Sequence, residues 1–288
     1  MNQNKYVLPD EKERHLLLQS PLNGDGLMLL FEAGLIWLTT NQAYVNSLNV
    51  FPVPDGDTGT NMVLTMQAAF NEAYQLRSKN AGETAKAFAQ GALMGARGNS
   101  GVILSQIWRG FSRALDHYET MGPDLLMRAM QEARNTAYKG VVKPVEGTIL
   151  TVIKDMTSAA EEVVTTGASL SEMLLAIVEA GDVSVKNTPE LLPVLKQAGV
   201  VDSGGTGLFY IFEGMVRLLQ GQSLDASGAI LKPLAELDLA NAMETVEEGQ
   251  DYEVVIDFAP HQGFALEKYY EDLAEIGTSI QVGEGDGI

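Results

Sequence analysis

Apolar residues recur at intervals of three and four along most of residues 25–220, which is the spacing of one buried face of an α-helix. In the first segment these positions are Leu27, Leu30, Ala33, Leu35 and Leu38. The same period returns in residues 62–73, 85–94, 102–115, 125–137, 149–163, 170–178 and 208–219. The pattern predicts about eight or nine helices joined by short loops, with no strand among them.

Small and turn-forming residues interrupt this pattern at 54–59, 95–101, 122–123, 144–147, 167–169, 187–189 and 202–207. Two of the breaks carry residues that favour a helix start. Ser169 precedes Glu172, and Thr188 precedes Pro189, so we expect new helices to begin after Ser169 and Thr188.

The pattern changes after Gly221. Residues 222–250 are rich in Ala, Leu and Glu, and residues 252–260 alternate as a strand does. An amphipathic helix is predicted over 266–277 and a short strand over 278–283. One such unit cannot bury both faces of its strands. We therefore divide the chain into a helical domain at 1–222, an acidic linker at 223–250, and the start of a second, truncated α/β domain at 251–288.

Composition narrows the classes of function. The 288 residues carry a net charge of −19, and residues 221–288 hold 15 acidic residues against two lysines. This balance argues against binding nucleic acid through a basic face. The chain has no cysteine, which excludes disulfides, thiolate catalysis and zinc–thiolate sites. Its three histidines are scattered, and we expect each of them at the surface.

Targeting signals are not evident in the sequence. The first residues, MNQNKYVLPDEKER, are polar and charged and do not resemble a secretory signal. No apolar run reaches about 18 residues, so no integral membrane segment is expected. We expect a cytoplasmic protein.

The stretch 49-NVFPVPDGDTGTNM-62 is the first that suggests chemistry. Asp55 and Asp57 lie two residues apart on a turn, where both carboxylates can reach one or two hard cations. Thr58, Thr60 and Asn61 follow at the start of a helix, where free N–H groups favour an anion. An EF-hand is excluded, because its required glycine and glutamate positions are occupied by Thr60 and Met66. An Asp-Gly turn that only caps a helix is the alternative.

Three further loops share this character. In 95-GARGNSGVIL-104 the backbone N–H groups of 98–101 and the Ser100 hydroxyl are suited to phosphate, although no P-loop pattern occurs. In 144-PVEGTIL-150, Thr148 heads a helix, and in 199-GVVDSGGTGL-208 Asp202 precedes a glycine-rich turn. Each loop alone is equally compatible with an ordinary helix–helix turn or cap.

Taken together and in this order, the four loops resemble the nucleotide-binding domain of the DAK2 (DhaL-like) superfamily. The resemblance covers about residues 20–222. It is closer to the ATP-binding subunit of bacterial fatty acid kinase than to the nucleotide-binding subunit of dihydroxyacetone kinase. It implies an all-α fold, an antiparallel barrel of about eight helices, which is followed here by the small incomplete α/β piece. The inter-helix loops at one end would hold the nucleotide through magnesium.

The resemblance also implies roles for individual residues. Asp55 and Asp57 would be the catalytic magnesium ligands, with Asn49 as a candidate third ligand. The residues that would contact the nucleotide are Thr58, Gly59, Thr60, Asn61, Asn99, Ser100, Gly101, Thr148, Asp202, Ser203 and Gly204.

The activity implied by the resemblance is phosphoryl transfer that depends on ATP and on one or two Mg²⁺ ions. The acceptor would be a fatty acid carboxylate presented by a separate fatty-acid-binding carrier protein, and the product an acyl phosphate. Such an acceptor is already an anion and needs no general base. The resemblance also allows a homodimer. A dihydroxyacetone-type kinase subunit and a non-catalytic nucleotide-binding or assembly module are the alternatives.

Overall fold

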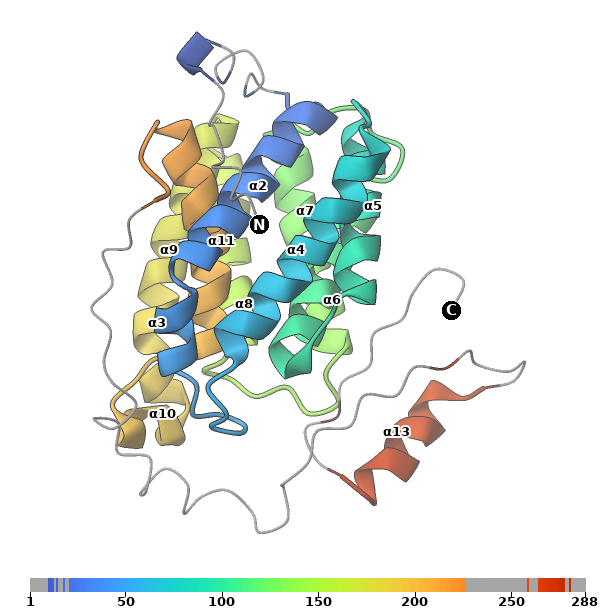
Figure 1. Ribbon diagram of the computed structural model, residues 1–288, viewed down its shortest axis with the longest axis vertical. Helices are drawn as coiled ribbons and strands as arrows, with labels where there is room; N and C mark the ends of the chain where they lie inside the picture. The colour runs from blue at the N-terminus through green and yellow to red at the C-terminus, as the bar shows by residue number, and fades with distance from the viewer. Residues whose placement is uncertain are drawn as a thin grey trace, which may run out of the picture.

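A computed structural model describes residues 10–12, 14, 18, 21–225, 258, 264–277 and 280 of the chain. Within 21–225, eight long helices run up and down beside one another (Figure 1). These are α2 (Gly24–Thr40), α4 (Thr58–Leu76), α5 (Ala81–Met94), α6 (Gly98–Ala114), α7 (Pro123–Lys139), α8 (Ile149–Val164), α9 (Leu170–Leu191) and α11 (Ser203–Leu219). Two short helices, α3 (Gln42–Ser47) and α10 (Pro193–Ala198), lie at one end of the bundle, and α13 (Leu266–Ala274) lies apart from it.

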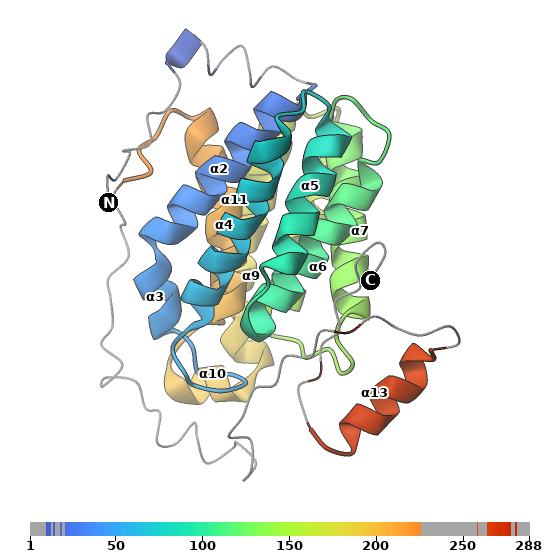
Figure 2. The same cartoon turned by 45° about the vertical axis from the view of Figure 1, so that its right-hand side comes forward.

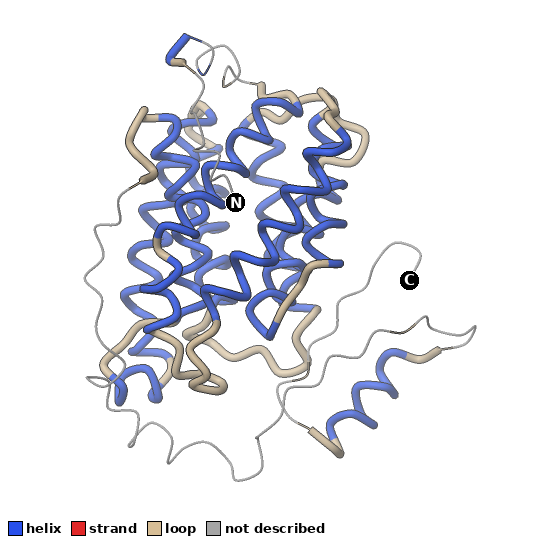
Figure 3. Tube along the Cα trace, viewed as in Figure 1, coloured by secondary structure: helices blue, strands red, loops and turns tan. Residues whose placement is uncertain are grey.

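Long helices that follow one another along the chain pack side by side. The contacts run from α2 through α4, α5, α6, α7, α8 and α9 to α11, which packs in turn against α2. Figure 2, turned by 45°, shows the same alternation of direction around the bundle. The described residues contain no strand, only an isolated bridge between Leu22 and Met121 (Figure 3). The prediction of an all-α fold is confirmed.

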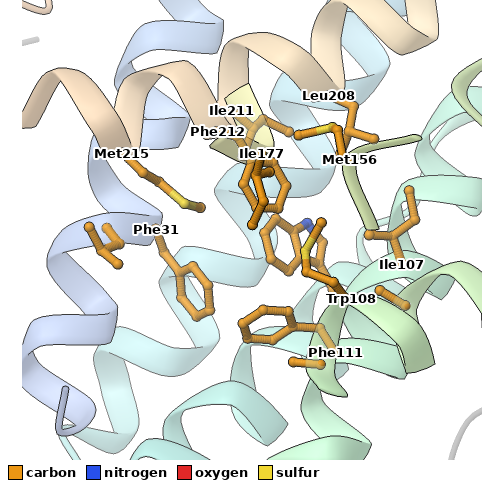
Figure 4. Packing of buried hydrophobic residues seen from close by; sticks show 14 of the residues in the cluster. Phe31, Ile107, Trp108, Phe111, Met156, Ile177, Leu208, Ile211, Phe212 and Met215 are labelled. Atoms are coloured by element: carbon orange, nitrogen blue, oxygen red, sulfur yellow. The ribbon is translucent and has the colours of Figure 1, made fainter. Parts of the chain in front are cut away.

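Aromatic side chains fill the interior of the bundle. Trp108 of α6 lies among Phe31, Phe88, Phe111 and Phe212, and its ring centroid is 5.2 Å from that of Phe31 (Figure 4). All five side chains are at most 3% exposed, and burial of this kind is the main source of the fold's stability. Only a gap of about 10 Å³ remains between them. A site for a polar ligand is therefore to be sought at the ends of the bundle.

Two predicted helix starts had opposite outcomes. Ser169 caps α9 in a complete capping box with Glu172, as predicted. The predicted start after Thr188 is wrong, because α9 continues to Leu191 with Pro189 inside it. Proline has no N–H to donate to the carbonyl of Val185, four residues earlier. The Thr188 hydroxyl donates to that carbonyl instead, at 2.7 Å, and so satisfies an acceptor that would otherwise be buried without a donor.

Other boundaries also differ from the predicted ones. Glycine-rich stretches expected to be loops already form the first turns of α6 and α11, which begin at Gly98 and Ser203. The six-residue helices α3 and α10 are too short to show a period and were missed. Helix α13 lies within the predicted 266–277. The predicted strands over 252–260 and 278–283 fall outside the described residues except at 258 and 280, and so does most of the predicted linker.

None of the described helices combines the length and the apolar character that a bilayer crossing requires.

Candidate functional site

The four loops singled out from the sequence lie at the same end of the bundle. Helices α4, α6, α8 and α11 all begin at the lower end in Figure 1, next to α3 and α10. We call this end the lower rim, and it comprises loops 49–57, 95–97, 140–148 and 199–202 with the helix turns that follow them. Because chain direction alternates around the bundle, four helix N-termini, each the positive end of a helix dipole, meet here.

Two carboxylates of the first loop lie close to each other. Asp55 lies at the protein surface and Asp57 is half-buried, and their side chains share a hydrogen bond. Partial loss of hydration, followed by the charge of Asp57, raises the pKa of Asp55 to about 6. Two anions held this close repel each other, and a divalent cation bound between them would relieve that repulsion.

Asn49 braces this loop in the structure. It is 3% exposed, and its Oδ1 accepts hydrogen bonds from the N–H groups of Asp57 (3.2 Å) and Thr58 (3.4 Å). Its Nδ2 donates to the carbonyl of Val53 at 2.9 Å. The Asn49 oxygen already accepts from two N–H donors, so the geometry gives Asn49 a structural role, and its role as a third metal ligand stays a prediction.

The first turn of α4 is held by a helix that the sequence did not reveal. The Thr60 hydroxyl accepts hydrogen bonds from Gln42 Nε2 (2.9 Å) and Asn46 Nδ2 (3.0 Å) of α3. Asn46 Oδ1 also accepts from the Thr60 N–H at 3.0 Å. A Cβ on Gly59 would come within 2.5 Å of the Gln42 carbonyl oxygen. Gly59 is therefore required for the close packing of α4 on α3.

The second loop packs directly on the first. Gly98 has φ +58, and a Cβ there would lie 2.4 Å from Asn61 Nδ2. A Cβ on Gly101 would lie 2.5 Å from the Thr65 hydroxyl oxygen. These two glycines let the first turn of α6, with Asn99 and Ser100, lie against α4 and beside Asn61.

Helix α6 begins without a side-chain cap. Its N-cap residue is Arg97, whose side chain has no acceptor, and the exposed Arg97 guanidinium donates to the neighbouring Ala96 carbonyl. The N–H groups of the first turn, from Gly98 to Ser100, therefore have no capping oxygen from the described side chains. Such a helix start is a ready site for an anion.

Asp202 connects the third loop to the fourth. Its carboxylate is buried and accepts a hydrogen bond from Gly205 N–H (2.6 Å), in the first turn of α11, and Ile149 N–H, in the first turn of α8, faces the same carboxylate. Burial raises the pKa of Asp202 to about 7, although these two N–H donors oppose the shift. Asp202 thus holds two helix N-termini together.

The neighbouring residues complete the link back to the first loop. Ser203 donates to the Thr58 hydroxyl oxygen at 3.1 Å, in a fully buried contact. Thr148 caps α8 weakly, with Oγ1 at 3.4 Å from the Leu150 N–H and at 2.7 Å from the Val145 carbonyl. The residues predicted from the sequence are therefore brought to one rim, and their individual roles toward a nucleotide stay predictions.

A pocket of about 270 Å³ opens beside this rim. Leu48, Leu195, Val200 and Val201 are among its walls, and most of these belong to a small apolar cluster separate from the main core. Within the described part of the chain, no three acidic or histidine side chains gather closely enough to hold a metal ion. A cation at Asp55 and Asp57 would have to complete its shell with water and ligand oxygens.

The fold and the rim define a class, an all-α domain whose one end gathers a carboxylate pair and an open helix N-terminus. The family model of the DAK2 domain matches residues 52–217, and the chain belongs to this family. The matched range contains every loop of the lower rim except residues 49–51.

Curated relatives are similar over almost all of this chain. An uncharacterised protein of Staphylococcus aureus (strain bovine RF122 / ET3-1) is 42% identical over 270 residues, which is 91% of this chain and 49% of the relative. One from Staphylococcus saprophyticus is 42% identical over 252 residues, 85% of this chain and 46% of the relative. The chain thus spans about half the length of these relatives.

A solved structure is also similar in part. It is the dihydroxyacetone kinase from C. freundii in complex with AMP-PNP and Mg²⁺. The match has a TM-score of 0.48 at 17% identity, and it covers 66% of this chain and 33% of that one.

Proposed function

We propose that the lower rim binds ATP with one or two Mg²⁺ ions and transfers the terminal phosphoryl group to a fatty acid carboxylate brought by a separate carrier protein. The observation that carries the proposal is the convergence, in a DAK2 domain, of the Asp55–Asp57 pair with the uncapped start of α6. Carboxylates and a helix N-terminus are complementary to the two parts of a magnesium–polyphosphate complex.

Asp55 and Asp57 are the groups that would hold the metal. They are the two carboxylates of the first loop, they lie within hydrogen-bonding distance of each other, and Asn49 fixes the backbone that carries Asp57. Bound Mg²⁺ would supply charge neutralisation for the phosphates. The rim itself has few basic residues to do so, and Arg97 is directed to a backbone carbonyl.

The phosphates would be held by backbone N–H groups and small side chains. The first turn of α6 offers N–H groups at Gly98, Asn99 and Ser100, and Asn61 lies against Gly98. Thr60 has its oxygen occupied by two N–H donors, so its own O–H is free to donate. Phosphoryl transfer depends mainly on such positioning and electrostatic stabilisation.

Three buried residues would support the groups that hold the phosphates, and these are Thr58, Ser203 and Asp202. All three are 4–6% exposed, and they join the N-termini of α4, α8 and α11 to one another. We assign them to holding the rim in shape, while Thr148 and Gly204 line its edge near α8 and α11. This division follows from burial, because a group sealed from solvent cannot contact a ligand that binds from solvent.

The proposed acceptor requires no deprotonation. A carboxylate oxygen of the fatty acid would attack the terminal phosphorus, and the bond from that phosphorus to the bridging oxygen of ADP would break. The products are an acyl phosphate and ADP, and no proton is transferred. This agrees with the absence of a histidine from the lower rim within the described residues.

Calorimetric titration of the whole chain with AMP-PNP, with and without Mg²⁺, tests the binding step. We expect binding that requires Mg²⁺, and no binding under either condition would refute the proposal. ATP consumption is then measured with fatty-acid-loaded carrier protein and, separately, with dihydroxyacetone and its carrier subunit. Binding without turnover in either assay would leave a non-catalytic nucleotide-binding module.

A further inference from the structure

Glu146 of the third loop joins the two helices that flank the loop. Its Oε2 accepts hydrogen bonds from Lys154 Nζ and from the Thr151 hydroxyl, both at 2.6 Å, and its Oε1 accepts from the Tyr138 hydroxyl at 3.0 Å. Tyr138 belongs to α7, whereas Thr151 and Lys154 belong to α8. One side chain thus ties the loop to the helix before it and the helix after it.

The Thr151 hydroxyl links Glu146 to the backbone of the third loop. It accepts a hydrogen bond from the Gly147 N–H at 2.8 Å while it donates to Glu146. Gly147 has φ +82, and a Cβ there would lie 2.8 Å from Leu192 Cβ and 2.9 Å from the Thr188 carbonyl oxygen. The loop backbone is therefore held between α8 and the end of α9 in a conformation that favours glycine.

Two residues after Gly147, the backbone of the third loop comes next to Asp202. Ile149, which directly follows Thr148, has its N–H facing the Asp202 carboxylate, and both residues flank Gly204. Asp202 accepts from Gly205, and Ser203 donates to Thr58 at 3.1 Å. A continuous series of contacts therefore connects Glu146 at the surface with the loop that carries Asp55 and Asp57.

We infer that Glu146 is a positioning residue of the lower rim, which fixes the third loop so that the Ile149 N–H stays on Asp202 and the starts of α8 and α11 keep their places. The inference rests on the proposed function for its ligand, magnesium–nucleotide. Glu146 itself would not touch the reacting atoms, because its oxygens already serve Lys154, Thr151 and Tyr138.

The chain offers a matched control. Glu190 accepts a hydrogen bond from Lys196 Nζ at 2.7 Å at the same end of the bundle, close to the length of the Glu146–Lys154 pair. Its side chain is 67% exposed, against 47% for Glu146, and the described contacts give it no second partner. Exposed ion pairs contribute little to stability. A difference in nucleotide affinity between alanine variants of Glu146 and Glu190 would therefore reflect the hydrogen bonds of Glu146 to Thr151 and Tyr138.

The experiment compares Glu146→Ala and Glu190→Ala in the full chain by calorimetric titration with AMP-PNP in the presence of Mg²⁺. We expect Glu146→Ala to weaken nucleotide binding by about tenfold, as loss of a supporting partner does in metal sites. Affinity for Mg²⁺ alone and the melting temperature should stay near those of the wild type. Glu146→Gln keeps one oxygen for Thr151 and should lose less.

A second readout does not depend on the nucleotide. Hydrogen exchange at the Ile149 amide should be faster in Glu146→Ala than in the wild type, and unchanged in Glu190→Ala. Unchanged exchange, or a nucleotide affinity equal to that of Glu190→Ala, would overturn the inference. A parallel fall in melting temperature and in Mg²⁺ affinity would also overturn it, because that pattern indicates general loss of structure. If the wild type bound no nucleotide, the proposed function would fail, and the exchange rates alone would decide the role of Glu146.

Discussion

At the upper end of the bundle, where α2, α5, α7 and α9 begin, each helix is closed by residues adjacent to it in sequence. Asn23, Asn80 and Ser169 accept hydrogen bonds from N–H groups three residues later, and α7 begins with Pro123, which has no N–H to satisfy. The loops there are joined through their backbones, for example from Ala81 N–H to the Glu119 carbonyl at 2.9 Å.

At the lower rim only α11 has a close local cap, Asp202, which accepts from the Gly205 N–H at 2.6 Å, and the other three helices begin differently. Asp57 and Arg97 provide no side-chain cap for α4 and α6, and Thr148 caps α8 at a long 3.4 Å. The first turn of α4 is satisfied by Asn46 and Asn49 from the preceding helix and loop. The rim is held together by side chains that are distant in sequence.

The two ends share the same helices and the same topology, so the difference lies in how the N–H groups are used. A local cap takes up a first-turn N–H group that a ligand could otherwise bind. At α6 the first turn is instead placed by close packing against Asn61 and Thr65 of α4, and its N–H groups have no side-chain cap. A helix start that is to bind an anion therefore has to be positioned by its neighbours while its own N–H groups stay uncapped.

The largest effect is expected from the metal-binding pair. Asp55→Ala or Asp57→Ala should abolish Mg²⁺-dependent nucleotide binding while the fold stays intact, because each removes one of the two carboxylates proposed to hold the ion. The loss should exceed about 100-fold, beyond what supporting residues cost. Calorimetry and circular dichroism measure the two properties.

Asp124→Ala, which removes an exposed acidic residue from the first turn of α7 at the upper end, is the matched control and should change nothing. If an Asp55 or Asp57 variant unfolds, and the wild type shows no response to Mg²⁺, the turn is structural and the two ends do not differ in function.

A pH dependence of stability is expected next. Asp202 keeps its proton in the folded protein up to about pH 7, whereas the unfolded chain releases it near 3.8. Its contribution is thus fully present below pH 3.8 and is lost as the pH rises through 7. The loss is on the order of 4 kcal/mol.

Asp202→Asn should flatten this part of the pH profile. Urea unfolding between pH 4.5 and 8 gives the free energy of unfolding of the wild type and of the variant. Their difference at each pH is the contribution of Asp202. Asp182→Asn, in an exposed pair with Lys186, should retain the wild-type slope. A difference that does not vary with pH would mean that Asp202 is ionised throughout, held by the two helix N-termini.

Two glycines with similar backbone angles sharpen the comparison further. Gly98 at the lower rim has φ +58 and faces Asn61, whereas Gly167 at the upper end has φ +75 and nothing within 4 Å of an added Cβ. Alanine at either position should cost about 1–2 kcal/mol for the left-handed backbone. Only Gly98→Ala should also weaken nucleotide binding, because it displaces Asn61.

Denaturant unfolding and nucleotide titration of both glycine variants provide the measurements. Equal nucleotide affinities for Gly98→Ala and Gly167→Ala would show that Asn61 and the start of α6 do not contribute to nucleotide binding.

The smallest effect is expected at an ordinary cap. Ser169→Ala removes the capping box of α9 and should cost about 1 kcal/mol of unfolding free energy. Nucleotide affinity should be unchanged, because this helix start is at the other end of the bundle. Should Ser169→Ala weaken nucleotide binding, the upper end would contribute to the site.

Much of the fold follows from local patterns. The period of apolar residues predicted the long helices, and the Ser169–Glu172 pair predicted the start of α9. The helix through Pro189 was not predicted, because its continuation depends on how the Thr188 hydroxyl replaces a missing donor. Helices α3 and α10 were missed because six residues do not show a period.

The candidate site was predictable as a set of residue types but not as an arrangement. Asp55, Asp57 and Ser100 were found from their loops. Gln42 and Asn46 were not, since nothing nearby in the sequence relates them to Thr60, 14 or more residues away. The hydrogen bonds by which Asn49 supports the backbone of this loop were not predictable either, because they depend on how the loop folds back on itself.

The sequence by itself determined which segments become helices and which loops carry carboxylates, glycines and hydroxyls, because both depend on residues close together in the chain. Only the tertiary structure decided that four of these loops share one rim and that Asp202 joins α8 to α11. The physical reason is that such contacts depend on the alternating direction and lateral packing of whole helices. No local preference encodes these features.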